Sequence, residues 1–240
     1  MTGSQGWLVT GGTRGIGRAV VDHVAKAGGS VVVLARAPAE EAYASDAVLE
    51  IPTDVTDGGA VVDALDRART HLGGVDVVVN CAGVHRGGRI GELDRGRWDE
   101  VLATNLTGAY EVCHAAVPHL AEGAAIVNVG AVVGFRGFPG DSAYASAKAG
   151  LAGLTRSLAV ELAPAGVRVN LVVPGFVDTA MTAGLSAAAR RRIVAAIPAG
   201  RTGTAEEIAE VVVAVAGASY MTGAVVPVDG GLMATFGGTG

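Results

Sequence analysis

The sequence predicts one α/β domain with a parallel sheet that binds a dinucleotide. Its 240 residues fit a single domain, residues 1–240, and half of them are apolar, which is enough for a large core. Residues 30–34 form a continuous apolar run, as in parallel strands buried on both faces. A glycine-rich stretch at residues 10–17 lies between a short apolar run and a helical pattern, the context in which such loops bind dinucleotides.

The other elements follow from the period of the apolar residues. We expect strands at residues 7–9, 30–34, 48–51, 75–79, 125–129, 168–173 and 225–228. We expect helices from about 16 to 24, 61 to 72, 98 to 117, 144 to 162 and 206 to 216. Residues from about 180 to 203 mix helical signals with Gly, Pro and three arginines, which fits either a mobile substrate lid or an ordinary surface helix.

Charge and composition exclude several functions. A net charge of −5 and a pI near 5.5 argue against a nucleic-acid partner. Cys81 and Cys113 have no metal-ligand spacing, and we expect no metal and a reduced, cytoplasmic location. The first residues lack a signal-peptide pattern, and no apolar run reaches the ~18 residues of a membrane span.

The sequence TGGTRGIG at residues 10–17 is the candidate phosphate loop. Glycines there let the backbone approach a pyrophosphate, and the N-terminus of the next helix attracts its charge. A plain glycine turn is the alternative. The cofactor contacts predicted in this loop are Gly11, Thr13, Arg14, Gly15, Ile16 and Gly17.

The end of the second expected strand predicts which cofactor is used. An acidic residue there would bind the adenosine ribose of NAD, but this strand ends in Ala35 and Arg36. Arg36 and Arg14 are placed to meet a 2′-phosphate, so we expect NADP(H) to be preferred over NAD(H). Either arginine alone is also compatible with a solvated surface position.

A tyrosine and a lysine four residues apart are the candidate catalytic pair. Tyr144 and Lys148 lie in an Ala-rich run, so both face one side of a helix. We expect the ammonium to lower the pKa of the phenol toward neutrality, so that Tyr144 exchanges a proton with a carbonyl or carbinol oxygen. The chain has one other lysine, Lys26. A surface tyrosine beside a surface lysine is the alternative.

Other polar residues follow expected strands or interrupt expected helices. Small residues and an amide at 80–83 suit a cofactor that crosses the sheet edge, and Asn105 interrupts a helix as either a functional residue or a kink. His85, Arg136 and Phe176 are candidate substrate contacts; for the first two, polar residues at the lip of a cleft are the alternative.

Together these motifs resemble the short-chain dehydrogenase/reductase superfamily over essentially the whole chain. The resemblance rests on TGGTRGIG at 10–17, NCAG at 80–83, TNLTG around Asn105, YASAK at 144–148 and PGFVDT at 174–179. PGFVDTAMT and the tail YMTGAVVPVDGGLM are most similar to the 3-oxoacyl-(acyl-carrier-protein) reductase branch.

The resemblance implies a doubly wound, seven-stranded parallel sheet with helices on both faces, a homotetramer, and hydride transfer between a nicotinamide and a carbonyl/alcohol pair. Tyr144 would be the acid/base, Lys148 would lower its pKa and hold the nicotinamide ribose, and Asn105 would support a water relay. Further implied cofactor contacts are Asp54, Val55, Asn80, Ala82, Gly83, Pro174, Gly175, Val177 and Thr179.

One position departs from the family pattern. The family places a serine thirteen residues before the tyrosine, where its hydroxyl binds the substrate oxygen, and this chain has Ala131 there. Loss of such a donor typically costs ~10²–10³ in rate. From the sequence, therefore, we expect Ala131→Ser to raise kcat/KM by about 10²-fold.

Two functions remain open from the sequence. The first is an NADP(H)-dependent ketoreductase that acts on a ketone, possibly a 3-oxoacyl thioester. The second is a cofactor-binding protein with little turnover that acts through assembly or regulation. Tyr144, Lys148 and Asn105 favour the first, and Ala131 is the feature that favours the second.

Overall fold

Seven strands form one parallel sheet in the computed structural model, which describes residues 5–43 and 45–235. Their order across the sheet is β3-β2-β1-β4-β5-β6-β7, so the chain winds outward from β1 in both directions. This confirms the doubly wound, seven-stranded fold. The strands are β1 (Gly6–Thr10), β2 (Ser30–Ala35), β3 (Val48–Pro52), β4 (Val75–Asn80), β5 (Leu120–Val129), β6 (Arg168–Pro174) and β7 (Val225–Val228).

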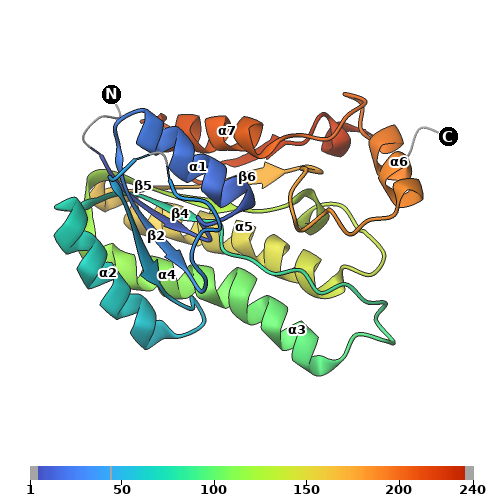
Figure 1. Cartoon of the computed structure of the whole chain (residues 1–240), viewed down its shortest axis with the longest axis horizontal. Coiled ribbons are helices and arrows are strands. Elements are labelled where there is room, and N and C mark those ends of the chain that lie inside the picture. The colour runs from blue at the N-terminus through green and yellow to red at the C-terminus, as the bar shows by residue number, and fades with distance from the viewer. Residues whose placement is uncertain (1–4, 44, 236–240) are drawn as a thin grey trace.

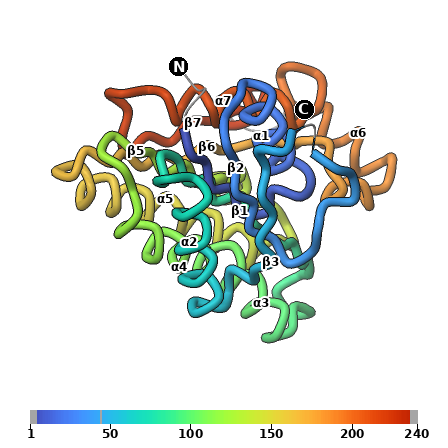
Figure 2. The backbone as a smooth tube through the Cα atoms, turned by 60° about the vertical axis from the view of Figure 1, so that its left-hand side comes forward, coloured from blue at the N-terminus to red at the C-terminus, as the bar shows by residue number. Residues whose placement is uncertain are grey.

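Helices cover both faces of the sheet (Figure 1 and Figure 2). Helices α1 (Gly15–Lys26) and α7 (Ala205–Gly217) lie on one face, and α2 (Gly58–Leu72), α4 (Gly108–Ala116) and α5 (Ser142–Leu162) lie on the other. Successive side chains of β1 point to opposite faces of the sheet and contribute to both cores. Trp7 packs with the first set of helices and Leu8 with the second. The central strands β1, β2, β4 and β6 are therefore buried on both sides, whereas the edge strands β3 and β7 are partly exposed.

The helix expected from 98 to 117 differs from the observed segment at its start and in its middle. Helix α3 (Arg95–Leu102) begins earlier because the Asp94 carboxylate caps it, accepting from the backbone N–H of Arg97 at 2.8 Å. A π-helical turn, η1 (Ala103–Thr107), then separates α3 from α4. Such turns are rare and recur at functional sites, and this one contains Asn105.

Strand β5 begins at Leu120, five residues before the apolar run at 125–129. Leu120 pairs with Val75 of β4, and the register shifts before Val77 pairs with Ala125. The first residues of β5 pair irregularly with β4, and no apolar pattern in the sequence predicts them. Helix α6 (Ala187–Ala196) is the helical part of the segment around 180–203 and projects from the body of the molecule (Figure 1).

Because all seven strands are parallel, their carboxyl ends lie at one edge of the sheet. The loops after β1, β4, β5 and β6 meet there, and these loops carry the sequence motifs. In the described ranges, the helices are too short or too polar to cross a lipid bilayer.

Candidate functional site

The glycine loop between β1 and α1 packs directly against the loop after β4. Gly11 has φ +68°, and a Cβ there would lie 2.8 Å from the Cα of Ala82. A Cβ on Gly17 would overlap the carbonyl oxygen of Gly11. Glycine is therefore required at both positions, and the N-terminus of α1, whose N-cap is Arg14, begins inside this cradle. The cradle fits the diphosphate of a dinucleotide.

Thr10 fixes the position of the loop after β4, a role that the sequence did not indicate. Its hydroxyl oxygen accepts from the backbone N–H groups of Cys81 and Ala82, both at 3.0 Å. The Asn80 side chain turns inward instead and donates to Asn128 at 2.9 Å. The side chain of Asn80 thus supports the loop from the interior, while Ala82 and Gly83 form the loop next to the glycine cradle.

Arg36 and Asp54 lie together at the ends of β2 and β3. The guanidinium and the carboxylate are 4.0 Å apart, and 58% of the Arg36 side chain is exposed, so it remains accessible to a ligand. The backbone N–H of Thr56 donates to the Asp54 carboxylate at 3.0 Å, and this hydrogen bond holds the pKa of Asp54 below its usual value. Val55 is buried beside them. Arg36 is thus available for an anionic group next to Asp54.

The loop after β6 approaches the glycine loop from the other side. Thr179 lies against Gly15, because a Cβ on Gly15 would be 3.5 Å from the Cγ2 of Thr179. Val177 is buried and forms a bridge with Gly203. Segments about 165 residues apart in the chain (177–179 against 11–17) therefore enclose one site.

Tyr144 and Lys148 occupy the first two turns of α5, on the edge where β5 ends. The Lys148 ammonium lies 5.6 Å from the centre of the Tyr144 ring and donates to the carbonyl oxygen of Val129 at 2.8 Å. Lys148 is 4% exposed, and burial lowers its pKa to about 8. The spacing YxxxK thus places both side chains at one site, as predicted.

The prediction that the pKa of Tyr144 is lowered toward neutrality is wrong. Burial of the phenol raises its pKa above the ordinary value, and the nearby Cys81 and Asp141 raise it further. The prediction from the sequence considered the positive charge of the lysine. It did not include the loss of water around the phenol on burial, which is the larger effect on the pKa. Tyr144 therefore holds its proton firmly in the protein alone.

Asn105 is held by three hydrogen bonds inside the π-helical turn. Its side-chain oxygen accepts from the N–H of Val84 at 3.0 Å, and its amide donates to the carbonyl oxygens of Val84 at 2.8 Å and Val101 at 2.9 Å. The side chain therefore joins the loop after β4 to α3. This clamping role was not predicted from the sequence, where the only signal was an amide in the interior of an expected helix.

Ala131 follows β5 with an extended backbone. His85 supplies a polar group beside Tyr144. The His85 ring meets the Tyr144 ring edge-on, with 5.2 Å between ring centres and 83° between planes. Its Nε2 lies 2.8 Å from a carboxylate oxygen of Asp141. The structure therefore brings His85 to Tyr144 of the candidate catalytic pair, together with Asp141, which was not predicted from the sequence.

Arg136 makes hydrogen bonds within the protein, and the prediction that it meets an anionic substrate stays a prediction. Its guanidinium donates to the carbonyl oxygen of Leu232 at 2.5 Å and to the Thr235 hydroxyl at 3.2 Å. These bonds attach the loop after β5 to η5 (Leu232–Ala234) near the end of the described chain. The half-buried arginine holds these two segments together. Its partners, Leu232 and Thr235, are distant in the sequence and come near only in the fold.

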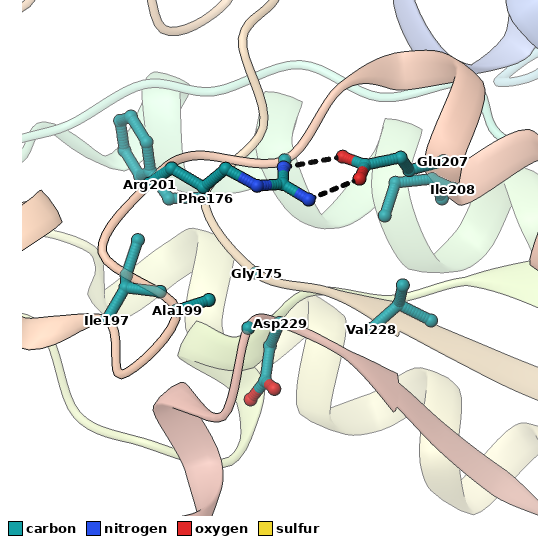
Figure 3. Close-up of a pocket in the computed structure, with 11 residues that line it drawn as sticks. Gly175, Phe176, Ile197, Ala199, Arg201, Glu207, Ile208, Val228 and Asp229 are labelled. Carbon is teal, nitrogen blue, oxygen red and sulfur yellow. Dashed lines mark hydrogen bonds and ion pairs between the residues drawn. The ribbon is translucent and has the colours of Figure 1, made fainter.

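Phe176 lines a separate hollow of about 120 Å³ beneath the loop after β6 (Figure 3). Its walls include Gly175, Ile197 and Val228, and a bidentate ion pair between Arg201 and Glu207 spans it (Figure 3). Tyr144 and Lys148 are not among its lining residues. The role of Phe176 toward a substrate stays a prediction.

These features define a class, the Rossmann-type α/β proteins with a dinucleotide cradle at the carboxyl edge of a parallel sheet. A family model described as Enoyl-(Acyl carrier protein) reductase matches residues 11–233. The chain is 38% identical to the 3-oxoacyl-[acyl-carrier-protein] reductase of Escherichia coli (strain K12) over 233 residues, 94% of this chain and 96% of the relative. It is 39% identical to the same-named reductase MabA of Mycobacterium avium over 233 residues, 95% of this chain and 90% of the relative.

Solved structures of dehydrogenases have the same fold as this chain. Thermoplasma acidophilum aldohexose dehydrogenase has a TM-score of 0.90 at 30% identity, covering 98% of this chain and 96% of its own. A short-chain dehydrogenase/reductase from Serratia marcescens has a TM-score of 0.89 at 36% identity, covering 96% and 99%. The chain belongs to the short-chain dehydrogenase/reductase superfamily and is an oxidoreductase related to the 3-oxoacyl-[acyl-carrier-protein] reductases.

Proposed function

We propose that this protein is an NADPH-dependent ketoreductase that acts on ketones, with 3-oxoacyl thioesters as the leading substrate class. One observation carries the proposal: Tyr144 and Lys148 lie one helical turn apart on α5, at the sheet edge that also holds the glycine cradle. The thioester class is supported by the names of the relatives that are 37–39% identical.

The cofactor would be held by the glycine loop, the loops after β4 and β6, and Lys148. NADPH, when bound, supplies the hydride for reduction of the carbonyl carbon. Tyr144 gives its phenolic proton to the substrate oxygen, and its raised pKa suits this direction because the phenol is neutral and ready to donate. Lys148, with a pKa of about 8, is charged for most of the time at neutral pH and stabilises the phenolate that remains.

The preference for NADPH rests on Arg14 and Arg36. Both are exposed near the cradle, and Arg36 lies beside Asp54, where the adenosine half of the cofactor belongs. Guanidinium groups bind phosphate oxygens in a bidentate manner, so an accessible pair favours the 2′-phosphate. Asn105 acts in this proposal by fixing the loop at Val84 and by supporting a water path behind Lys148.

The segment around α6 is proposed as the substrate lid. The Arg190 guanidinium donates to both carboxylate oxygens of Asp178 at 2.6 Å, and the Thr202 hydroxyl donates to Asp178 at 2.7 Å. These bonds attach the lid to the loop that contains Val177 and Thr179. Opening the lid therefore requires breaking this exposed ion pair and the Thr202 hydrogen bond, and the ion pair contributes little.

We propose a cytoplasmic homotetramer as the working form. Exposed apolar side chains lie on α4 and α5, among them Tyr110 and Val160, of which Val160 is 78% exposed. Exposed apolar groups on adjacent helices favour a closed, symmetric assembly of identical chains.

A weakly active, cofactor-binding protein is the second candidate, and Ala131 is the observation that favours it. The two are separated by mixing the protein with NADPH and a panel of ketones, including a 3-oxoacyl thioester, and following nicotinamide absorbance. Turnover that Tyr144→Phe removes supports the reductase. Cofactor binding without turnover on any member of the panel supports the second candidate.

A further inference from the structure

We propose that His85, held by Asp141, donates the second hydrogen bond to the substrate oxygen that the alanine at 131 does not provide. The inference rests on the proposed ketoreductase function and names a further catalytic residue for it. It starts from contacts that join His85, Asp141 and Tyr144 in one cluster.

The position of His85 is fixed from two sides. Asp141 holds Nε2 at 2.8 Å, and the backbone N–H of Gly88 donates to the carbonyl oxygen of Gly140 at 2.9 Å, which ties the two loops together. Asp141 is itself the N-cap residue of α5, and its carbonyl oxygen accepts from Ala145 N–H at 2.7 Å. The imidazole is therefore attached to the same helix that carries Tyr144.

Part of the His85 side chain is exposed beside the Tyr144 ring. The two rings touch edge-on, and the His85 side chain is 35% exposed while Asp141 is 14% exposed. Nδ1 is the ring nitrogen that Asp141 leaves free. We place the carbonyl oxygen that accepts from the Tyr144 hydroxyl within reach of this nitrogen. Ser142, the other hydroxyl near Tyr144 in sequence, has a buried oxygen that does not reach the open side of the site.

Donation from Nδ1 requires a proton on both ring nitrogens, because Asp141 accepts from Nε2. The titratable and charged groups around His85 are Asp141, the neutral phenol of Tyr144, and Arg86, whose guanidinium is paired with Glu100 at 2.7 Å. The carboxylate of Asp141 balances the imidazolium charge, and the Glu100 carboxylate balances that of Arg86. No proton leaves His85: the hydride adds to the carbonyl carbon, the carbonyl electron pair moves to oxygen, and Tyr144 supplies the proton.

The first test is a double-mutant cycle on one ketone, with His85→Gln, Ala131→Ser and the combination. We expect His85→Gln to lower kcat by about 10²-fold, as for removal of one oxyanion donor, with unchanged NADPH affinity. Ala131→Ser should raise kcat/KM less than ~10-fold in the parent but ~10²-fold or more in the His85→Gln background, since it restores the missing donor. This replaces the larger gain expected from the sequence alone. His71→Gln on α2 is the matched control, and melting temperatures exclude unfolding.

A second readout needs no turnover. The affinity for the ketone in the presence of NADP⁺, measured by fluorescence, should fall about tenfold in His85→Gln and hold in His71→Gln. Asp141 is a positioning residue, so Asp141→Asn should lower kcat more than it raises the KM for the ketone.

Equal gains from Ala131→Ser in both backgrounds, or His85→Gln with the parent's kcat and ketone affinity, would overturn the role of His85. Those outcomes leave the reductase proposal standing if Tyr144→Phe is inactive. Absence of turnover in every variant sinks the reductase proposal, and the NADP⁺-dependent ketone affinity then still decides the role of His85.

Discussion

The ammonium of Lys148 donates a 2.8 Å hydrogen bond to the carbonyl oxygen of Val129, the last residue of β5. This contact joins α5, the helix that carries the proposed catalytic pair, to the end of the strand that precedes Ala131. It also buries the cation, and burial lowers the pKa of Lys148 to about 8 from 10.5. The lysine is thus placed for chemistry at a cost in stability.

Lys148→Met should change how stability depends on pH. Between about pH 8 and 10.5 the unfolded chain binds more protons at this lysine than the folded chain does, so its contribution to stability rises with pH. From pH 7.5 to 9.5 the parent should gain about 2 kcal/mol relative to Lys148→Met, measured by urea unfolding. Lys26→Met, in the last turn of α1, is the matched lysine control. Parallel pH curves for the parent and Lys148→Met would show that the lysine is not shifted.

Arg36→Ala should weaken NADPH binding about tenfold and leave NADH binding unchanged, because a charge-assisted contact to the 2′-phosphate is lost. Fluorescence titration with both cofactors measures this. Arg95→Ala removes an exposed arginine on α3 that pairs with Asp99, and should affect neither cofactor. Equal affinity of the parent for NADPH and NADH would contradict the assigned preference.

Arg136→Ala should destabilise the protein by about 1.5–3 kcal/mol, since the half-buried guanidinium loses its bonds to Leu232 and Thr235. Hydrogen exchange should increase around residues 232–235. The KM for an anionic substrate should change by less than about twofold. Arg97→Ala, which removes an exposed pair with Asp94, is the control. A large rise in KM without loss of stability would instead support Arg136 as a substrate contact.

Val160→Glu should dissociate the proposed tetramer, because it places a charge on the exposed apolar face of α5. Light scattering should show a smaller species than for the parent, and Ile90→Glu, an exposed apolar position outside α4 and α5, should not change the mass. A parent that scatters as a 23.8 kDa monomer would contradict the assembly.

The sequence predicted the fold well because each strand carries a local signal. Continuous apolar runs located six of the seven strands to within about two residues, and the spacing of Tyr144 and Lys148 fixed their shared face. The first part of β5 lacked such a signal, since its pairing with Val75 depends on a register shift in the neighbouring strand.

The parts of the site that were missed depend on contacts between distant segments. Arg136 looked free until the fold brought Leu232 to it, 96 residues along the chain. Asp141 had no significance until His85, 56 residues away, reached it. The pKa of Tyr144 was mispredicted because burial is a property of the packed site. The sequence spacing between Tyr144 and Lys148 carries no information about it.

The central claim is that Tyr144 is the proton donor of a ketoreductase. Its most direct test compares NADPH oxidation by the parent and by Tyr144→Phe on a ketone panel that includes a 3-oxoacyl thioester. We expect measurable turnover by the parent and a loss of about 10²-fold or more in Tyr144→Phe, with cofactor affinity retained. A Tyr144→Phe protein that oxidises NADPH with these ketones as fast as the parent would contradict the account.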